Sequence, residues 1–258
     1  MSVADDFTDR LSPRQRAIRY WLTRTIISLG VRCYLRVTPP SGLDRLPPAP
    51  FVLCFNHLNW VDPFVVLTVW PQEPKLYIYG PKEADMHRGW RNRLITWTGM
   101  AVPFNPAKTN LLASTRRATA VLEAGRVLAI AGEGRLSERE DVVMPIHEGA
   151  AFLAIRAGVP IVPLAINGTR WLSFGRSVRV RLAEPIPTAG LRADRATLEA
   201  TTARLHAALS ELVRDYPTGP VPGRVGRWLT DLFNERPWLA SERLDEAADP
   251  GPSSGPMG

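Results

Sequence analysis

The chain has 258 residues and a mass of 28.6 kDa, which is enough for one large domain with appendages or for two small domains. Hydrophobic residues make up 45% of the sequence, a share that excludes a wholly disordered chain. The formal net charge of +7 favours an anionic partner, whether nucleic acid, anionic lipid or a phosphorylated substrate.

The first predicted element is a helix that begins at Ser12–Pro13, a favourable N-cap and N1 pair, and runs toward Thr38. Apolar residues at helical spacing form a stripe on this helix: Ile18, Trp21, Leu22, Ile26, Leu29 and Cys33. Tyr20 and Ile27 fall on the polar side. Six arginines and no acidic residue lie in this segment, which is not apolar enough to span a membrane. It is therefore predicted either to lie on an anionic membrane surface or to pack against its own domain.

Strands and helices alternate along the rest of the chain. The predicted strands are 51–55, 76–79, 127–131, 160–166 and 178–182, and the predicted helices follow Pro63 or span 109–123, 148–157 and 194–215. This alternation predicts an α/β fold, with a single domain at residues 47–218 in which a mixed β-sheet is flanked by helices. Residues 1–46 hold the amphipathic helical segment. Residues 219–258 are predicted to hold an aromatic amphipathic piece at 225–239 and a disordered tail.

The strand at 51–55 ends directly before Asn56–His57, and Asp62–Pro63 follows five residues after the histidine. Aspartate before proline is a preferred helix start, so Asp62 could be only an N-cap and His57 an ordinary histidine. At a strand-to-helix turn, however, the two side chains can converge. The carboxylate would then hold one imidazole nitrogen and leave the other as a general base. No GxSxG motif or P-loop is present, so such a base would act directly on a substrate hydroxyl.

Glu133, Gly134 and Arg135 directly follow the predicted strand at 127–131. Glycine at a strand end lets the backbone approach a ligand closely, and an arginine there could bind phosphate. The alternative is a surface loop that contains a salt bridge.

The chain has two cysteines, Cys33 and Cys54, too few for a disulfide scaffold or a cysteine-ligated metal. Cys54 lies within a predicted strand and is expected to be a buried thiol rather than a nucleophile. The histidines lack the spacing of a metal site, so we expect no metal and no bound cofactor.

Together these stretches resemble the glycerolipid acyltransferase family, which includes the 1-acylglycerol-3-phosphate acyltransferases. NHLNWVD at 56–62 resembles the family's NHxxxxD motif, GEGRLS at 132–137 its FPEGTRS block, and VPIVPLAI at 159–166 its fourth block. The three stretches stand in the family's order over residues 50–170.

The resemblance implies that His57 is the catalytic base and Asp62 its orienting partner. It places Glu133, Gly134 and Arg135 in the acceptor site, with Arg135 on the phosphate. The implied reaction is acyl transfer from acyl-CoA or acyl carrier protein, as co-substrate, to a lysophospholipid hydroxyl. Lysophosphatidate (1-acylglycerol-3-phosphate), which would give phosphatidic acid, is the default acceptor.

Three positions depart from the family pattern. Gly132 replaces the proline that usually precedes the glutamate, and Leu136 stands where a second arginine is usual. In the weaker second block, Lys82 fits the outline and is predicted to bind substrate, but Asn105 stands at the position of a phosphate-binding arginine. Since an arginine–phosphate contact is thereby lost, another lysolipid or a hydroxylated lipid stays open as the acceptor.

A lipid substrate favours the membrane alternative for the N-terminal segment. The expected location is the cytoplasmic face of the cell membrane, as a peripheral or monotopic protein, because the acidic N-terminal residues do not resemble a signal peptide. The competing hypothesis is a non-enzymatic basic protein that binds membrane or nucleic acid through charge alone. No motif that reads nucleic acid is present, so no nucleic-acid partner is expected.

Overall fold

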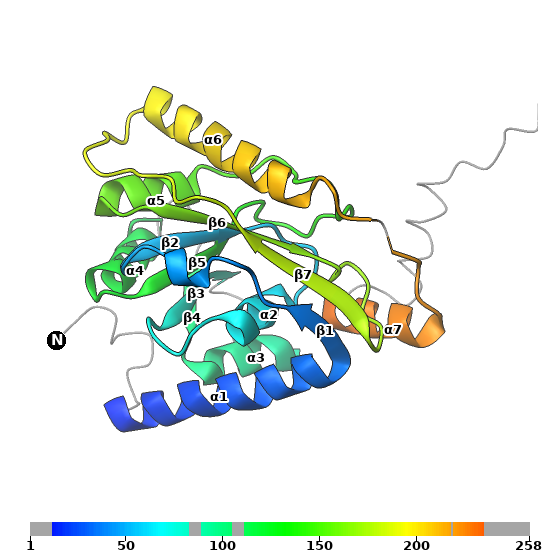
Figure 1. The fold of residues 1–258 in the computed structure, drawn as a ribbon. Helices are drawn as coiled ribbons and strands as arrows, with labels where there is room; N and C mark the ends of the chain where they lie inside the picture. Colours follow the sequence, from blue (N-terminus) through cyan, green and yellow to red (C-terminus); the bar gives the residue numbers. More distant parts are fainter. Residues whose placement is uncertain (1–11, 83–88, 105–110, 218, 235–258) are drawn as a thin grey trace, which may run out of the picture.

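A seven-stranded mixed β-sheet forms the centre of the computed structural model, which describes residues 12–82, 89–104, 111–217 and 219–234 (Figure 1). The strand order is β1-β7-β6-β2-β5-β3-β4. All neighbouring strands are parallel except β6 and β7, which are antiparallel. The predicted fold class, a mixed sheet flanked by helices with a helix ahead of it, is confirmed.

The elements downstream of residue 50 follow the predicted order, and β2 and β5 have the predicted bounds. The strands are β1 (Leu35–Thr38), β2 (Phe51–Phe55), β3 (Leu76–Lys82), β4 (Ala101–Phe104), β5 (Val127–Ala131), β6 (Ile161–Asn167) and β7 (Arg176–Leu182). The helices are α1 (Pro13–Tyr34), α2 (Asp62–Val69), α3 (Gly89–Thr98), α4 (Leu111–Glu123), α5 (Gly149–Ala157), α6 (Arg195–Val213) and α7 (Arg224–Asn234), with a short 3-10 turn, η2 (Leu43–Arg45). Three elements, β1, α3 and β4, were not predicted. The predicted tail lies outside the described residues.

The prediction of one helix from Ser12 to Thr38 is wrong at its C-terminal end. The helix stops at Tyr34, and residues 35–38 form β1, which pairs in parallel with β7 at the edge of the sheet. Two prolines follow directly at 39–40, and a residue before proline is driven toward extended backbone. The sheet therefore includes residues ahead of the predicted domain start at 47.

Helix α1 has one face against the protein and one face that is exposed. Tyr20, Thr23 and Ile27 face the protein, and the tyrosine and threonine are buried. The predicted apolar stripe faces away from it, with Ile18, Trp21, Ile26 and Leu29 between 47% and 64% exposed. The helix therefore packs against its own domain, as one alternative predicted, but through the face that holds Tyr20 and Ile27, and the predicted stripe is left exposed. None of the helices in the described ranges has the length and hydropathy needed to cross a bilayer.

Strand β2 lies at the middle of the sheet and is buried on both faces. Its alternate residues Phe51, Leu53 and Phe55 pack into the cluster that contains α2, while Val52 and Cys54 join the cluster formed with α4, α5 and α6. Because β2 and β5 are parallel neighbours, the loops that follow them leave the same edge of the sheet side by side.

Candidate active site

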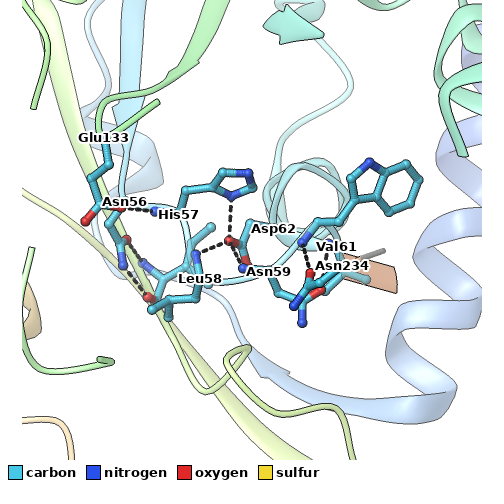
Figure 2. A network of polar contacts seen from close by, with 10 residues as sticks. Asn56, His57, Leu58, Asn59, Val61, Asp62, Glu133 and Asn234 are labelled. Carbon is cyan, nitrogen blue, oxygen red and sulfur yellow. Dashed lines mark hydrogen bonds and ion pairs between the residues drawn. The ribbon is translucent and has the colours of Figure 1, made fainter. Parts of the chain in front are cut away.

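His57 and Asp62 converge in the turn between β2 and α2 (Figure 2). The imidazole Nδ1 lies 2.9 Å from Asp62 Oδ2. The Asp62 side chain is fully buried, whereas 19% of the His57 side chain is exposed. With Nδ1–H donating to the carboxylate, Nε2 is left as the nitrogen that can accept a proton from a ligand.

The Asp62 carboxylate also organises the turn itself. Its Oδ2 accepts the backbone N–H groups of Leu58 at 2.6 Å and Asn59 at 2.8 Å. An N-cap side chain accepts from the first turn of the helix that follows it, but these donors precede α2, and the cap position belongs to Val61. The alternative in which Asp62 is only a helix N-cap is therefore wrong. Asp62 holds the loop that carries His57.

Asn56 anchors the other end of this loop. Its side-chain amide donates to the carbonyl oxygen of Ile166 at 2.9 Å and accepts the N–H of the same residue at 2.7 Å. This pair continues the β2–β6 ladder by one side chain and is buried, as Asn56 is only 2% exposed. The residue before His57 is therefore fixed at two points.

Glu133 joins the loop after β5 to the His57 loop. One carboxylate oxygen accepts the backbone N–H of His57 at 2.7 Å, and the other accepts that of Met144 at 2.7 Å. The residue is 1% exposed, and burial raises the pKa of its carboxyl group although both backbone hydrogen bonds act against this rise. The resemblance placed Glu133 in the acceptor site. In the structure its oxygens are occupied by backbone amides, so it positions the loops.

Replacing Glu133 with glutamine tests whether these two hydrogen bonds position the loops. The amide keeps one acceptor but places an NH2 group against a backbone N–H, so one hydrogen bond is replaced by two facing donors. We expect the melting temperature to fall, because a buried donor left unpaired costs about 1–3 kcal/mol, and kcat to fall about tenfold or more, because the backbone of His57 loses the contact that positions it. Steady-state kinetics of the variant would measure the loss.

Glu140 offers a matched control for that variant. Glu140 is also buried and accepts a backbone N–H, that of Gly168 at 2.8 Å. It makes no hydrogen bond to His57 or Met144. Glu140→Gln should lower the melting temperature and leave kcat near the parent value. Equal kinetic effects of the two variants would contradict a specific role of Glu133.

Gly134 and Arg135 follow Glu133 in the sequence and lie at the surface. Gly134 has a φ of +63°, a backbone conformation that favours glycine, and a Cβ there would also require the exposed His147 ring, 2.8 Å away, to move. Arg135 is exposed, and its guanidinium makes no ion pair or hydrogen bond with another described residue. The backbone of Lys82 ends β3 opposite Phe104, two strands from β2. Its side chain and Asn105 lie outside the described part.

Cys54 is buried beneath this site, as predicted. It is fully inaccessible, and burial raises the pKa of its thiol to about 12. A Cβ on Gly132 would lie 2.9 Å from its Sγ. The glycine that replaces the family's usual proline therefore leaves room for the cysteine.

The thiols should differ in reactivity, since the thiolate is the reactive form and only Cys33 is exposed. We expect a chromogenic disulfide reagent to titrate one thiol per folded chain and two in denaturant. Rapid reaction of both thiols in the folded protein would contradict the burial of Cys54.

Two contacts from α7 to the loop that carries His57 were not predicted from the sequence. The N–H of Trp60 donates to Asn234 Oδ1 at 3.0 Å (Figure 2). The Trp60 ring stacks on Phe233 with 6.0 Å between ring centroids. The aromatic pattern at 225–239 was the only local signal, and it did not indicate which segment these rings would contact.

Comparisons with known proteins match most of the region that carries this site. A family model described as Acyltransferase matches residues 40–167, which include β2 to β6 and both loops of the site. Among solved structures, the chain is similar to the 1-acyl-sn-glycerophosphate (LPA) acyltransferase PlsC from Thermotoga maritima. The TM-score is 0.58 at 18% sequence identity, and the match covers 82% of this chain and 88% of that one. At this identity the likeness shows a shared fold.

Proposed function

Through residues 40–167 the chain belongs to the acyltransferase family, and we propose that it moves a fatty acyl group from a thioester to a lysophospholipid hydroxyl. The observation that carries this proposal is the His57–Asp62 pair, with a buried carboxylate on Nδ1 and a partly exposed imidazole. The donor is acyl-CoA or acyl carrier protein. A general base in this position contributes about 10²–10⁴-fold to the rate.

In the proposed mechanism, His57 Nε2 takes the proton of the acceptor hydroxyl as its oxygen attacks the thioester carbonyl. The negative charge of Asp62 stabilises the imidazolium that forms. When the tetrahedral intermediate collapses, the C–S bond breaks and the imidazolium returns the proton to the departing thiolate. No covalent acyl-enzyme forms, so the ester product and the free thiol appear together.

Lysophosphatidate is the proposed acceptor, because the exposed Arg135 lies on the loop that Glu133 joins to His57 and can bind a phosphate. The likeness to a solved LPA acyltransferase supports the same choice. The departures at Leu136 and Asn105 favour a weaker phosphate site, so another lysolipid is the second candidate.

Replacing Arg135 with alanine should raise the KM for lysophosphatidate about 10–100-fold, since a charged hydrogen bond contributes about 1.5–3 kcal/mol. The KM for monoacylglycerol, which lacks the phosphate, should stay unchanged, as should the KM for the thioester donor. An increase confined to the donor KM would contradict this placement.

Peripheral attachment to the cytoplasmic face of an anionic membrane is part of the proposal. Its support is α1, whose exposed stripe of Ile18, Trp21, Ile26 and Leu29 lies on a helix rich in arginine. Binding there would keep the enzyme beside a lipid acceptor and leave it accessible to a donor from solution.

Incubating purified protein with palmitoyl-CoA and lysophosphatidate tests the function. We expect phosphatidic acid by mass spectrometry and an equal amount of free CoA thiol. Acyl carrier protein as donor and other lysolipids as acceptors would then establish preference. Salt-sensitive binding to anionic vesicles without turnover of any thioester would instead favour the non-enzymatic basic protein.

A further inference from the structure

Helix α7 packs Leu229 and Phe233 against the protein, but a second apolar stripe on the same helix faces away from it. Gly226, Thr230 and Asp231 are buried on its inner side. Val225 is 74% exposed, Trp228 44% and Leu232 40%, and their spacing places these three residues on one outer face. We call this set the α7 stripe. Exposing three large apolar side chains in a row is unfavourable in water, so the stripe points to a contact.

The inner side of α7 contacts the loop that carries His57. Asn234 accepts the backbone N–H of Trp60 at 3.0 Å, three residues from His57. Phe233 stacks on the Trp60 ring and meets the Trp90 ring edge-on, with 5.6 Å between the latter ring centroids. Whatever the α7 stripe contacts is therefore joined to the loop that carries His57 through two side chains of α7, Asn234 and Phe233.

Exposed apolar residues continue from α7 toward α1. Phe174, 80% exposed, meets Tyr34 at the end of α1 edge-on, and Leu172 of the same loop donates its N–H to Thr230 of α7. Trp90 and Trp97 of α3 are 51% and 43% exposed. Figure 1 shows α1, α3 and α7 on the side of the sheet away from α5 and α6. The α7 stripe thus adjoins the surface assigned above to membrane contact.

The chemistry of this side fits a phospholipid surface better than a protein groove. Tryptophan is the side chain most typical of the membrane interface, and Trp228 and the two α3 tryptophans supply it here. Arg224 is exposed at the start of α7, where it can meet lipid phosphate. Asp231, the acidic residue of α7, is buried and adds no negative charge to the outer face.

We propose that α7 is a second membrane-contacting helix, which lays the α7 stripe on a phospholipid surface and holds the His57 loop there through Asn234 and Phe233. The proposal rests on the proposed function in that a lipid acceptor must reach His57 from the bilayer. Its contact surface is distinct from α1, the only helix that the sequence pattern assigned to the membrane.

The test compares two double variants of the full-length protein by vesicle flotation. Val225→Ser with Leu232→Ser alters the α7 stripe. Leu112→Ser with Leu191→Ser removes the same residue class on α4 and ahead of α6, where the two leucines are 71% and 43% exposed. The vesicles are equimolar phosphatidylcholine and phosphatidylglycerol, and melting temperatures verify that both variants fold.

The α7 double variant should partition into vesicles about tenfold less than the parent, because it loses two apolar side chains from the contact. The control should partition like the parent. Equal partitioning of all three proteins, or a change of oligomeric state in place of weaker flotation, would overturn the proposal. Flotation needs no turnover, so weak flotation of the α7 variant beside an inactive parent would refute the proposed function alone.

The link to the loop has its own test. Asn234→Ala leaves the α7 stripe intact but removes the acceptor of the Trp60 N–H, so kcat should fall severalfold while vesicle partitioning stays. Asn234→Asp can still accept that hydrogen bond and should restore most of the rate. An unchanged kcat in Asn234→Ala would overturn the positioning role of α7.

Discussion

Replacing His57 with alanine is expected to lower kcat for acyl transfer by about 10²–10⁴-fold, the usual contribution of a positioned general base. The fold should remain, because two backbone hydrogen bonds of this residue do not depend on its ring. Its N–H donates to Glu133 at 2.7 Å, and its carbonyl oxygen accepts the N–H of Ser137 at 2.6 Å. Steady-state rates and a melting curve on one preparation would measure both effects.

His206 supplies the control for this variant. Its ring nitrogen lies 3.2 Å from the carbonyl oxygen of Val143, and no carboxylate in the described part of the chain is bonded to it. His206→Ala should keep near-parent rates. A folded His57→Ala enzyme that also keeps them would show that another group accepts the proton.

Replacing Asp62 with alanine should have the largest effect on stability. The side chain is fully buried, and it accepts from the backbone of Leu58 and Asn59 as well as from His57. Without it, two buried amide N–H groups lose their acceptor, at about 1–3 kcal/mol each. We expect the free energy of unfolding to fall by about 2–6 kcal/mol, as measured by denaturant titration.

Asp62→Asn separates the charge from the hydrogen bonds. All three donors converge on Oδ2, while Oδ1 has no partner among the described residues. The side-chain oxygen of an asparagine can therefore take the position of Oδ2, and its NH2 group can take the position of Oδ1. Most of the stability should return, but kcat should stay depressed about 10²-fold or more because a neutral amide does not stabilise an imidazolium. A variant with normal kcat and low stability would leave Asp62 a purely structural role.

The sequence predicted the centre of the sheet well because its strands are buried on both faces. Such strands read as short apolar runs, and β2 and β5 have the predicted bounds. The convergence of His57 and Asp62 was also foreseeable, since a strand-to-helix turn can bring positions five apart together. The role of Glu133 was not foreseeable. Its partners are backbone amides, which leave no trace in the identity of the residues that carry them.

The missed elements lack a local signal. Strand β1 has four residues, and its only strand partner, β7, begins about 140 residues later in the chain. The periodicity of α1 identified an apolar stripe correctly but not the side that faces the protein, because Tyr20 and Ile27 pack inward on the face taken as polar. Amphipathic spacing defines two faces, and only tertiary contacts assign them.

The side-chain amide of Asn56 bonds to the main-chain atoms of Ile166 and makes no use of its sec-butyl side chain. Exchange of one aliphatic residue for another at 166 would therefore keep both hydrogen bonds, although this side chain is fully buried and a change of its volume would cost stability. Proline at 166 would remove the N–H group that donates to Asn56 Oδ1. A shift of β6 by one residue would move both main-chain partners away from the Asn56 amide. Either change would disturb the turn that carries His57, so the register of β6 against β2 is a condition for the geometry of the site.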